Sequence, residues 1–242
     1  MRKLVALAAM AFAVLLAAPV AAADMPDIEI PDVEFDLGDS FYLRGSAAFN
    51  IHWAKEVIHP DACVCGPFPT NQLGYGYSWG VGFGYETGTG LRFDATIDTL
   101  ETRGLRITKE GVDDDVDGDY TLLLRSTLGL ANVYYDFSFG DFGFGGGGTF
   151  GYVGGGVGLA WNHAEVNSPI TNPVPVGGNV TPAAALMAGI GYDMGSWVMD
   201  VGYRGIYLHQ INNAPTSDPD YYYEIDNNFI HELRSTVRYR LN

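Results

Sequence analysis

The sequence predicts an all-β protein, an eight-stranded antiparallel up-and-down transmembrane β-barrel. Three observations predict it: an export signal, an apolar composition without a membrane-length apolar run, and eight runs of alternating polarity. The chain has 242 residues, of which 47% are hydrophobic and 17% charged, with 32 glycines and 15 tyrosines. A transmembrane helix needs about 20 consecutive apolar residues, and none follow the export signal. The apolar residues must therefore fill a β-sandwich core or face lipid.

The amino terminus has the layout of a signal peptide. Arg2 and Lys3 precede an apolar run over residues 4–18, and small residues at 21–23 form a cleavage site. We expect residues 1–23 to be removed. Without the two basic residues the chain keeps 11 basic against 29 acidic residues, a net charge of −18. Nucleic acid is a poor partner for such a chain, because phosphate binding needs clustered lysine and arginine.

The first alternating run, residues 41–53, shows the period most clearly. Its outward set is Phe41, Leu43, Gly45, Ala47, Phe49, Ile51 and Trp53, and its inward set is Tyr42, Arg44, Ser46, Ala48, Asn50 and His52. An average strand has about five or six residues, whereas a tilted strand that crosses a bilayer needs about 9–11. The length therefore favours a membrane strand.

Seven further runs repeat the alternation, at residues 78–85, 91–98, 120–136, 150–162, 184–192, 197–207 and 229–241. In the fourth run the leucines (Leu122, Leu124, Leu128 and Leu130) are expected to face lipid, and Arg125, Thr127, Gly129 and Ala131 the lumen. The fifth run sets Val153, Val157, Leu159 and Trp161 against inward glycines. Eight such runs predict eight strands.

The connections between the runs alternate in length. Residues 54–74, 102–119, 163–181 and 209–227 are long and polar, whereas residues 87–90 and 193–196 are tight turns and residues 137–149 are glycine-rich with uncertain strand boundaries. This alternation predicts long loops outside the cell and short turns in the periplasm. An aromatic girdle is expected from Trp53, Trp79 and Trp161 at the loop ends and from Phe41, Tyr85, Trp197 and Tyr239 at the turn ends.

A soluble β-sandwich also alternates with period two, so the register decides between the two folds. Slipping the third run by one residue would place Arg92, Asp94 and Asp98 in lipid. That slip costs on the order of 5–10 kcal/mol. Because this cost fixes the register with the charged residues inside and the large apolar residues in lipid, the pattern favours the membrane barrel.

The inward positions form a candidate site, because an eight-stranded barrel is just wide enough for side chains to fill it. Its charged members are Arg44, Arg92, Asp94, Asp98, Arg125, Asp200, Arg204, Glu232 and Arg234. Mixed signs predict a salt-bridged plug, since an unpaired buried ion is costly. The glycines of the fifth run are expected to make room for the arginines. The alternative is a narrow water-filled conduit lined by the same charges, that is, a small-solute porin.

Several segments together resemble a known family. They are residues 41–45 (FYLRG), 91–94 (LRFD), 131–137 (ANVYYDF), 152–158 (YVGGGVG) and 200–204 (DVGYR). In this order they are similar to the small outer-membrane barrels of the opacity and OmpA-like type from alphaproteobacteria. The resemblance implies a surface-exposed protein with an envelope-stabilising, adhesive or immunogenic role and no defined reaction. Members usually end on an aromatic residue that the barrel-assembly machinery recognises, whereas this chain ends on Asn242.

The segment 24–40 is acidic, with seven acids and no base over residues 24–39. Pro26 and Pro31 each begin a pentad, which forbids a helix and favours an extended chain. The segment is either a disordered periplasmic leader or a recognition segment for a periplasmic partner or peptidoglycan. The family resemblance implies that a mature terminus at Ala23-Asp24 can be tethered to peptidoglycan.

Two outer loops contain residue types that bind metals. In the second loop, Asp113, Asp115, Asp117 and Asp119 alternate as in the first half of a calcium loop, with Gly118 sixth. The twelfth position is Leu124 instead of glutamate, so the alternatives are a solvated acidic loop and a weak Ca²⁺ site. No other cofactor is expected.

The first outer loop contains Cys63 and Cys65, two thiols exported to an oxidising environment. A ring closed over one residue is strained. The alternatives are a labile local disulfide, an intermolecular disulfide, and soft-metal capture.

The predicted function is a structural and surface-interaction role without catalysis. None of the five histidines lies in a histidine–serine signature, although a lipid A-modifying enzyme with catalytic groups at the rim remains the enzymatic alternative. The expected partners are outer-membrane lipids and lipopolysaccharide, which acids in 110–119 and 218–226 would reach through divalent cations.

Overall fold

A computed structural model describes residues 39–58, 67–109, 117–139, 148–167, 174–214 and 222–241. The expected signal peptide, the acidic segment up to residue 38, and Cys63, Cys65, Asp113 and Asp115 lie outside the described residues. No helix among the described residues is long and apolar enough to cross a membrane.

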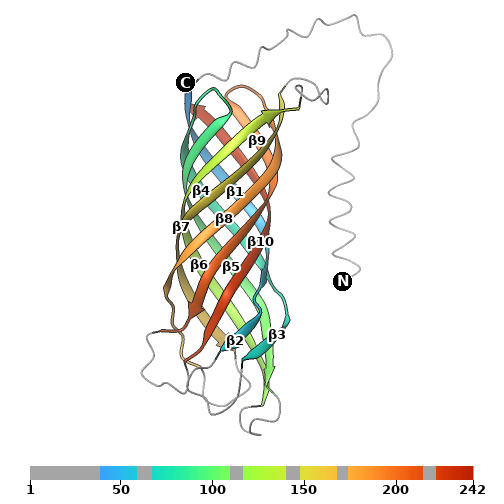
Figure 1. The fold of residues 1–242 in the computed structure, drawn as a ribbon, viewed down its shortest axis with the longest axis vertical. Coiled ribbons are helices and arrows are strands. Elements are labelled where there is room, and N and C mark those ends of the chain that lie inside the picture. Colours follow the sequence, from blue (N-terminus) through green and yellow to red (C-terminus); the bar gives the residue numbers. More distant parts are fainter. Residues whose placement is uncertain are drawn as a thin grey trace, which may run out of the picture. The chain divides into compact units, whose positions relative to one another are not determined.

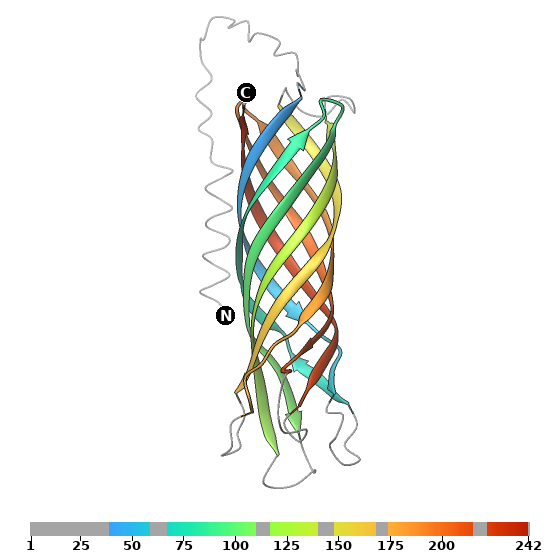
Figure 2. The ribbon, with the colours of Figure 1, turned by 90° about the vertical axis from the view of Figure 1, so that its left-hand side faces the viewer.

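Eight long strands close a ring in chain order. They are β1 (Ser40–Trp53), β4 (Gly74–Glu86), β5 (Leu91–Lys109), β6 (Gly118–Ser138), β7 (Thr149–Asn167), β8 (Val180–Asp193), β9 (Trp197–Asn212) and β10 (Glu224–Leu241). Each pairs antiparallel with the next, and β1 pairs with β10 from Phe41–Leu241 to Trp53–Phe229. Figures 1 and 2 show these strands tilted relative to the axis of one barrel and winding around it. The predicted eight-stranded up-and-down antiparallel barrel is confirmed.

The two ends of the barrel differ. The turn end, at the top of Figure 1, carries the tight connections β4–β5 and β8–β9, where Gly88, Gly90 and Gly195 have positive φ angles of 70°, 86° and 87°. Glycine adopts these angles without steric cost. The loop end carries the short strands β2 (Glu56–Ile58) and β3 (Phe68–Gln72), which link β10 to β5. The barrel therefore has short turns at one end and long connections at the other.

Large apolar side chains cover the outer wall. Ile97, Leu186 and Leu233 are 62%, 74% and 65% exposed, although they lie in the middle of long strands. The girdle residues Trp53, Trp79, Trp161 and Trp197 also face outward, as do Tyr85 and Tyr239. A soluble protein buries such side chains, so this wall has the polarity of a surface solvated by lipid.

The prediction of which residues face outward was wrong for one strand, β6. Leu122, Leu124, Leu128 and Leu130 are inside and at most 5% exposed, while Arg125, Thr127, Gly129 and Ala131 face outward. The strand register explains the reversal, because directly paired residues share a face of the sheet. Gly129 pairs with Ile97 and Thr127 pairs with Trp161, both of which face outward. The leucines fill the lumen near the loop end.

Candidate functional site

The lumen contains a closed ring of four charges, which we call the quartet: Asp98 of β5, Arg204 of β9, and Glu232 and Arg234 of β10. Arg204 lies 2.9 Å from Asp98 and 2.7 Å from Glu232, and Arg234 bonds Asp98 and lies 3.5 Å from Glu232. All four side chains are at most 5% exposed, and Ser78 of β4 donates a 2.6 Å hydrogen bond to Glu232. Each ion therefore has two partners of opposite charge, which offsets its desolvation.

A second pair lies one step closer to the turn end. The Arg44 guanidinium contacts Asp94 at 2.6 Å and donates a hydrogen bond to the Tyr134 hydroxyl at 2.8 Å. Tyr42 and Asn132 donate the remaining hydrogen bonds to the Asp94 carboxylate, at 2.9 and 2.7 Å. Three strands, β1, β5 and β6, are thus tied through a single buried carboxylate.

A chain of ion pairs closes the turn end. Its members, in order, are Arg92, Asp136, Arg238, Glu86, Arg240 and Asp193, each in contact with the next. Arg238 also lies 3.8 Å from Asp200, to which Tyr152 donates a hydrogen bond of 3.2 Å. This chain connects β5 and β6 with β4, β10 and the last residue of β8, so its charges lie across the turn-end opening of the barrel.

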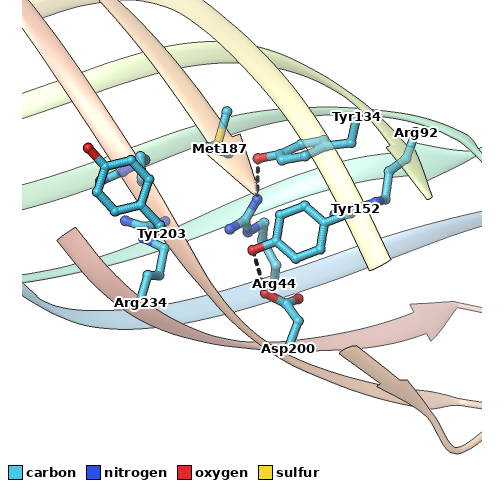
Figure 3. A pocket seen from close by; sticks show the side chains of 9 residues that line it. Arg44, Arg92, Tyr134, Tyr152, Met187, Asp200, Tyr203 and Arg234 are labelled. Atoms are coloured by element: carbon cyan, nitrogen blue, oxygen red, sulfur yellow. Dashed lines mark hydrogen bonds between the residues drawn. The ribbon is translucent and has the colours of Figure 1, made fainter. Parts of the chain in front are cut away.

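The space between the Asp94 layer and the turn-end chain is small. The cavity between them, lined by Arg44, Arg92, Tyr134, Tyr152 and Asp200 among others, measures about 10 Å³. Figure 3 shows the arginine and tyrosine side chains converging on it from opposite walls. A cavity needs roughly 10–15 Å³ to hold one water molecule. This section of the lumen therefore has room for about one water and not for a continuous file.

Glycines on the inner wall make room for these large side chains. On β4 a Cβ at Gly80 would lie 2.1 Å from the Asp98 carboxylate, and one at Gly84 would lie 2.3 Å from the Tyr42 ring. On β7, Gly154 and Gly156 make room for Tyr134 and Asn132. The expectation that the glycines of this strand make room for arginines was wrong, because tyrosine and asparagine lie against them.

Aliphatic side chains fill the lumen toward the loop end. Leu100, Leu124, Leu128, Ile206, Leu208 and Ile230 are each at most 1% exposed and belong to one buried cluster. Tyr223 caps this cluster beyond the strands, where burial, with the Glu165 carboxylate adding to it, raises the pKa of the phenol. His52 and Asn228 share a 3.0 Å hydrogen bond within the layer. The lumen thus has a charged half and an apolar half.

The structure places most of the predicted lumen charges inside. Arg44, Arg92, Asp94, Asp98, Asp200, Arg204, Glu232 and Arg234 are at most 7% exposed. Arg125 is the exception and a correction: its side chain is 50% exposed on the outer wall beside Glu101. The sequence analysis missed Glu86, Asp136, Arg238 and Arg240. Two of these, Arg238 and Arg240, occupy inward positions of the last run, so the alternation contained the signal.

Of the four predicted calcium ligands, the structure describes Asp117 and Asp119. Asp119 accepts hydrogen bonds from Arg106 and Thr108, at 2.9 and 2.6 Å. Among the described residues no group of three or more histidine, cysteine, aspartate or glutamate side chains could hold a metal. Asp113 and Asp115 lie outside that part of the chain.

Comparison with known proteins finds likeness in structure only. No family model and no curated protein matches the sequence. Among solved structures, Neisserial surface protein A is 20% identical with a TM-score of 0.48, over 84% of this chain and 99% of that chain. Ail of Yersinia pestis is 12% identical (TM-score 0.41, 84% and 99% covered), and OprG from Pseudomonas aeruginosa is 12% identical (0.44, 84% and 97%).

The class of protein that the fold and the site define is a small closed β-barrel with an apolar outer wall. Its distinguishing feature is a lumen filled in two chemically different halves.

Proposed function

We propose that the chain is an outer-membrane barrel that remains closed and has a structural, envelope-stabilising and surface-interaction role. The observation that carries the proposal is the filled lumen. Ion pairs cross the turn end, a cavity of about 10 Å³ separates the charged layers, and an aliphatic cluster packs the loop end. A continuous row of solute molecules through the lumen would have to displace side chains in both its charged and its apolar half.

The outer wall supports the membrane location. Its apolar side chains and tryptophan girdle match the surface of a lipid-facing barrel, and the amino-terminal export signal leads to the envelope. The loop end then lies outside the cell, since long connections of membrane barrels are extracellular. Lipopolysaccharide and outer-leaflet lipids are the partners that this placement provides.

The proposed role includes no catalysis. His52 is bonded to Asn228 within the apolar layer, and His231 shares a 2.6 Å hydrogen bond with Tyr203 on the lipid-facing wall. Neither histidine is positioned beside a serine and a carboxylate, the arrangement that nucleophilic catalysis requires.

Fractionation and conductance together test the proposal. We expect the protein in the outer-membrane fraction, with a heated sample that migrates differently from an unheated one on a denaturing gel. In planar bilayers the folded protein is expected to give no reproducible conductance steps. Recovery of folded monomer from detergent-free buffer would contradict the membrane location, and regular single-channel steps would favour the porin alternative.

A further inference from the structure

We propose that the outer wall of β5 and β6 binds one lipopolysaccharide molecule, with a lipid phosphate between Arg103 and Arg125 and an acyl chain along β6. The inference rests on the proposed outer-membrane location and names the lipid and the residues that hold it. The site consists of a basic pair, a track of small residues below it, and a groove into which the track leads.

The basic residues of the chain are distributed unevenly. Six of them, all arginines, are in the lumen network: Arg44, Arg92, Arg204, Arg234, Arg238 and Arg240. The five other described basic residues, Lys55, Arg103, Arg106, Lys109 and Arg125, lie in the loop half, four of them on β5 and β6. An acidic protein thus concentrates its non-luminal cations on one hairpin.

Within this hairpin, Arg103 and Arg125 share one carboxylate. Glu101 accepts a hydrogen bond of 2.8 Å from Arg103 and one of 3.2 Å from Arg125. The guanidinium groups are 65% and 50% exposed, whereas the Glu101 side chain is 18% exposed. His163 of β7 pairs directly with Arg125 and is also exposed. Two exposed guanidinium groups flank one carboxylate on the outer wall, and Glu165, which is exposed on β7, lies two strands from Arg103 across Leu123. The pair therefore offers guanidinium N–H donors to an anion that displaces Glu101 from between them.

The pair lies at the height of lipid phosphates. Glu101 pairs with Tyr77 and Thr99 with Trp79, while Thr127 pairs with Trp161. Arg125 is two residues beyond Thr127 toward the loop end, which is at most about 7 Å along the strand. Tryptophan girdles lie at the interface between hydrocarbon and headgroups. Both guanidinium groups therefore lie just outside the hydrocarbon, where lipid phosphates are found.

Below Arg125 the outward side chains of β6 are unusually small. We call Thr127, Gly129 and Ala131 the β6 track. The Trp161 ring lies against it, since a Cβ at Gly129 would lie 3.3 Å from that ring. From Arg125 to Ala131 is six residues, which on a strand tilted by about 40° descends roughly 15 Å, half of a hydrocarbon core of about 30 Å. The track therefore spans one leaflet.

The track leads into a groove of about 770 Å³ on the outer wall. Its floor consists of small residues from four adjacent strands, Ala131, Gly155, Ala184 and Gly205, and Leu186, Tyr203 and Phe229 rise beside it. Its surface is almost entirely apolar, so it fits hydrocarbon. The charged pair at the upper end of the same track selects an anionic lipid, and the loop-end position selects the outer leaflet.

The test is titration of the folded full-length mature protein in detergent micelles with diphosphoryl lipid A, measured by native mass spectrometry. The double variant R103Q/R125Q is expected to weaken binding by roughly tenfold or more, because two charge-assisted contacts to phosphate are lost. E101Q is expected to strengthen binding several-fold, because the competing carboxylate loses its charge. A residue with only a structural role would give the opposite sign for E101Q.

The track has its own variants and controls. G129L/A131L is expected to weaken binding several-fold by filling the track while both arginines remain. K55Q is the control for loss of one charge at the loop end, and G45L is the control for a leucine on the outer wall, since a Cβ at Gly45 has nothing within 4 Å. Both controls are expected to bind like the unaltered protein.

Three results would overturn the inference: equal binding by R103Q/R125Q and the unaltered protein, equal binding of lipid A stripped of phosphate, or full displacement by millimolar inorganic phosphate, which would leave the track without a role. Heat-modifiable migration is measured for every variant. R103Q/R125Q protein that migrates as a folded barrel but binds unchanged contradicts this inference alone, whereas absence of the unaltered protein from the outer membrane contradicts the proposed function.

Discussion

The two halves of the lumen are closed by opposite means. In the turn half, six arginines and seven carboxylates meet, with side chains at most 17% exposed, and eight of these thirteen ions contact two or more partners of opposite charge. In the loop half, leucine and isoleucine side chains pack on one another with almost no exposure. Directional pairing closes one half and non-directional packing closes the other.

The two halves differ in how a substitution changes the free energy of unfolding. A buried ion pair adds little net stability against an apolar replacement, yet removing one partner is strongly destabilising because the other charge is left buried. An aliphatic layer loses only the transfer free energy and the cavity term for the atoms removed. The charged half is therefore specific and fragile, while the apolar half responds in proportion to the volume lost.

The largest effect is expected from Asp98→Asn in the quartet. Asp98 is fully buried between Arg204 and Arg234, so the variant leaves two guanidinium groups with Glu232 alone. We expect a loss of about 4 kcal/mol in the free energy of unfolding, measured by urea unfolding in lipid vesicles with tryptophan fluorescence. The balanced double variant D98L/R234M is expected to recover more than half of that loss. Equal loss in both variants would contradict the charge argument.

The next effect is expected from Leu124→Ala in the apolar half. Leu124 is fully buried and pairs with Thr102, away from the quartet, and the change removes three carbons from a packed cluster. We expect a loss of about 3 kcal/mol that does not change between low and high salt. A salt-dependent loss would indicate that the two halves are coupled. Bilayer recordings of this variant are expected to stay silent, because the ion pairs at the turn end remain.

The two halves of the lumen also explain which parts of the fold can be predicted from the sequence. Strand number, closure and the outward face of seven strands follow from alternation, because in those strands one face is charged or small and the other is large and apolar. In β6 both faces are apolar over much of the strand, and polarity alone assigns the leucines to lipid. The sequence does not show that the loop half of the lumen is itself apolar, which depends on packing among strands distant in the chain.

The ion pairs within the lumen could not be predicted from the sequence for a similar reason. Asp98 and Arg204 are 106 residues apart, and Glu86 and Arg238 are 152 apart. The alternation predicts that these four side chains face inward, but their position along the barrel axis depends on the strand register. The register is set jointly by the turns and by all eight pairings.

A smaller effect is expected where a strand contributes space instead of a side chain. Gly80→Ala on β4 would place a methyl group 2.1 Å from the Asp98 carboxylate, so the quartet must shift. We expect a loss of about 2 kcal/mol, typical of overpacking, measured by the same urea unfolding. The matched control is Gly45→Ala on β1, whose Cβ has nothing within 4 Å. If both variants lose equally, backbone entropy is the cause and the space argument fails.

The smallest effect is expected from an ion pair outside the lumen. Arg106 contacts Asp119 at 2.9 Å, a distance like those in the quartet, but the two side chains are 37% and 51% exposed. Water and salt screen such a pair, and we expect Arg106→Gln to change the free energy of unfolding by less than about 1 kcal/mol. Because the contact distances are similar and the burial is not, comparison with Asp98→Asn shows how strongly burial and the second arginine partner of Asp98 raise the cost. A loss as large as that of Asp98→Asn would mean that the quartet owes its effect to contact distance and not to burial in the charged half.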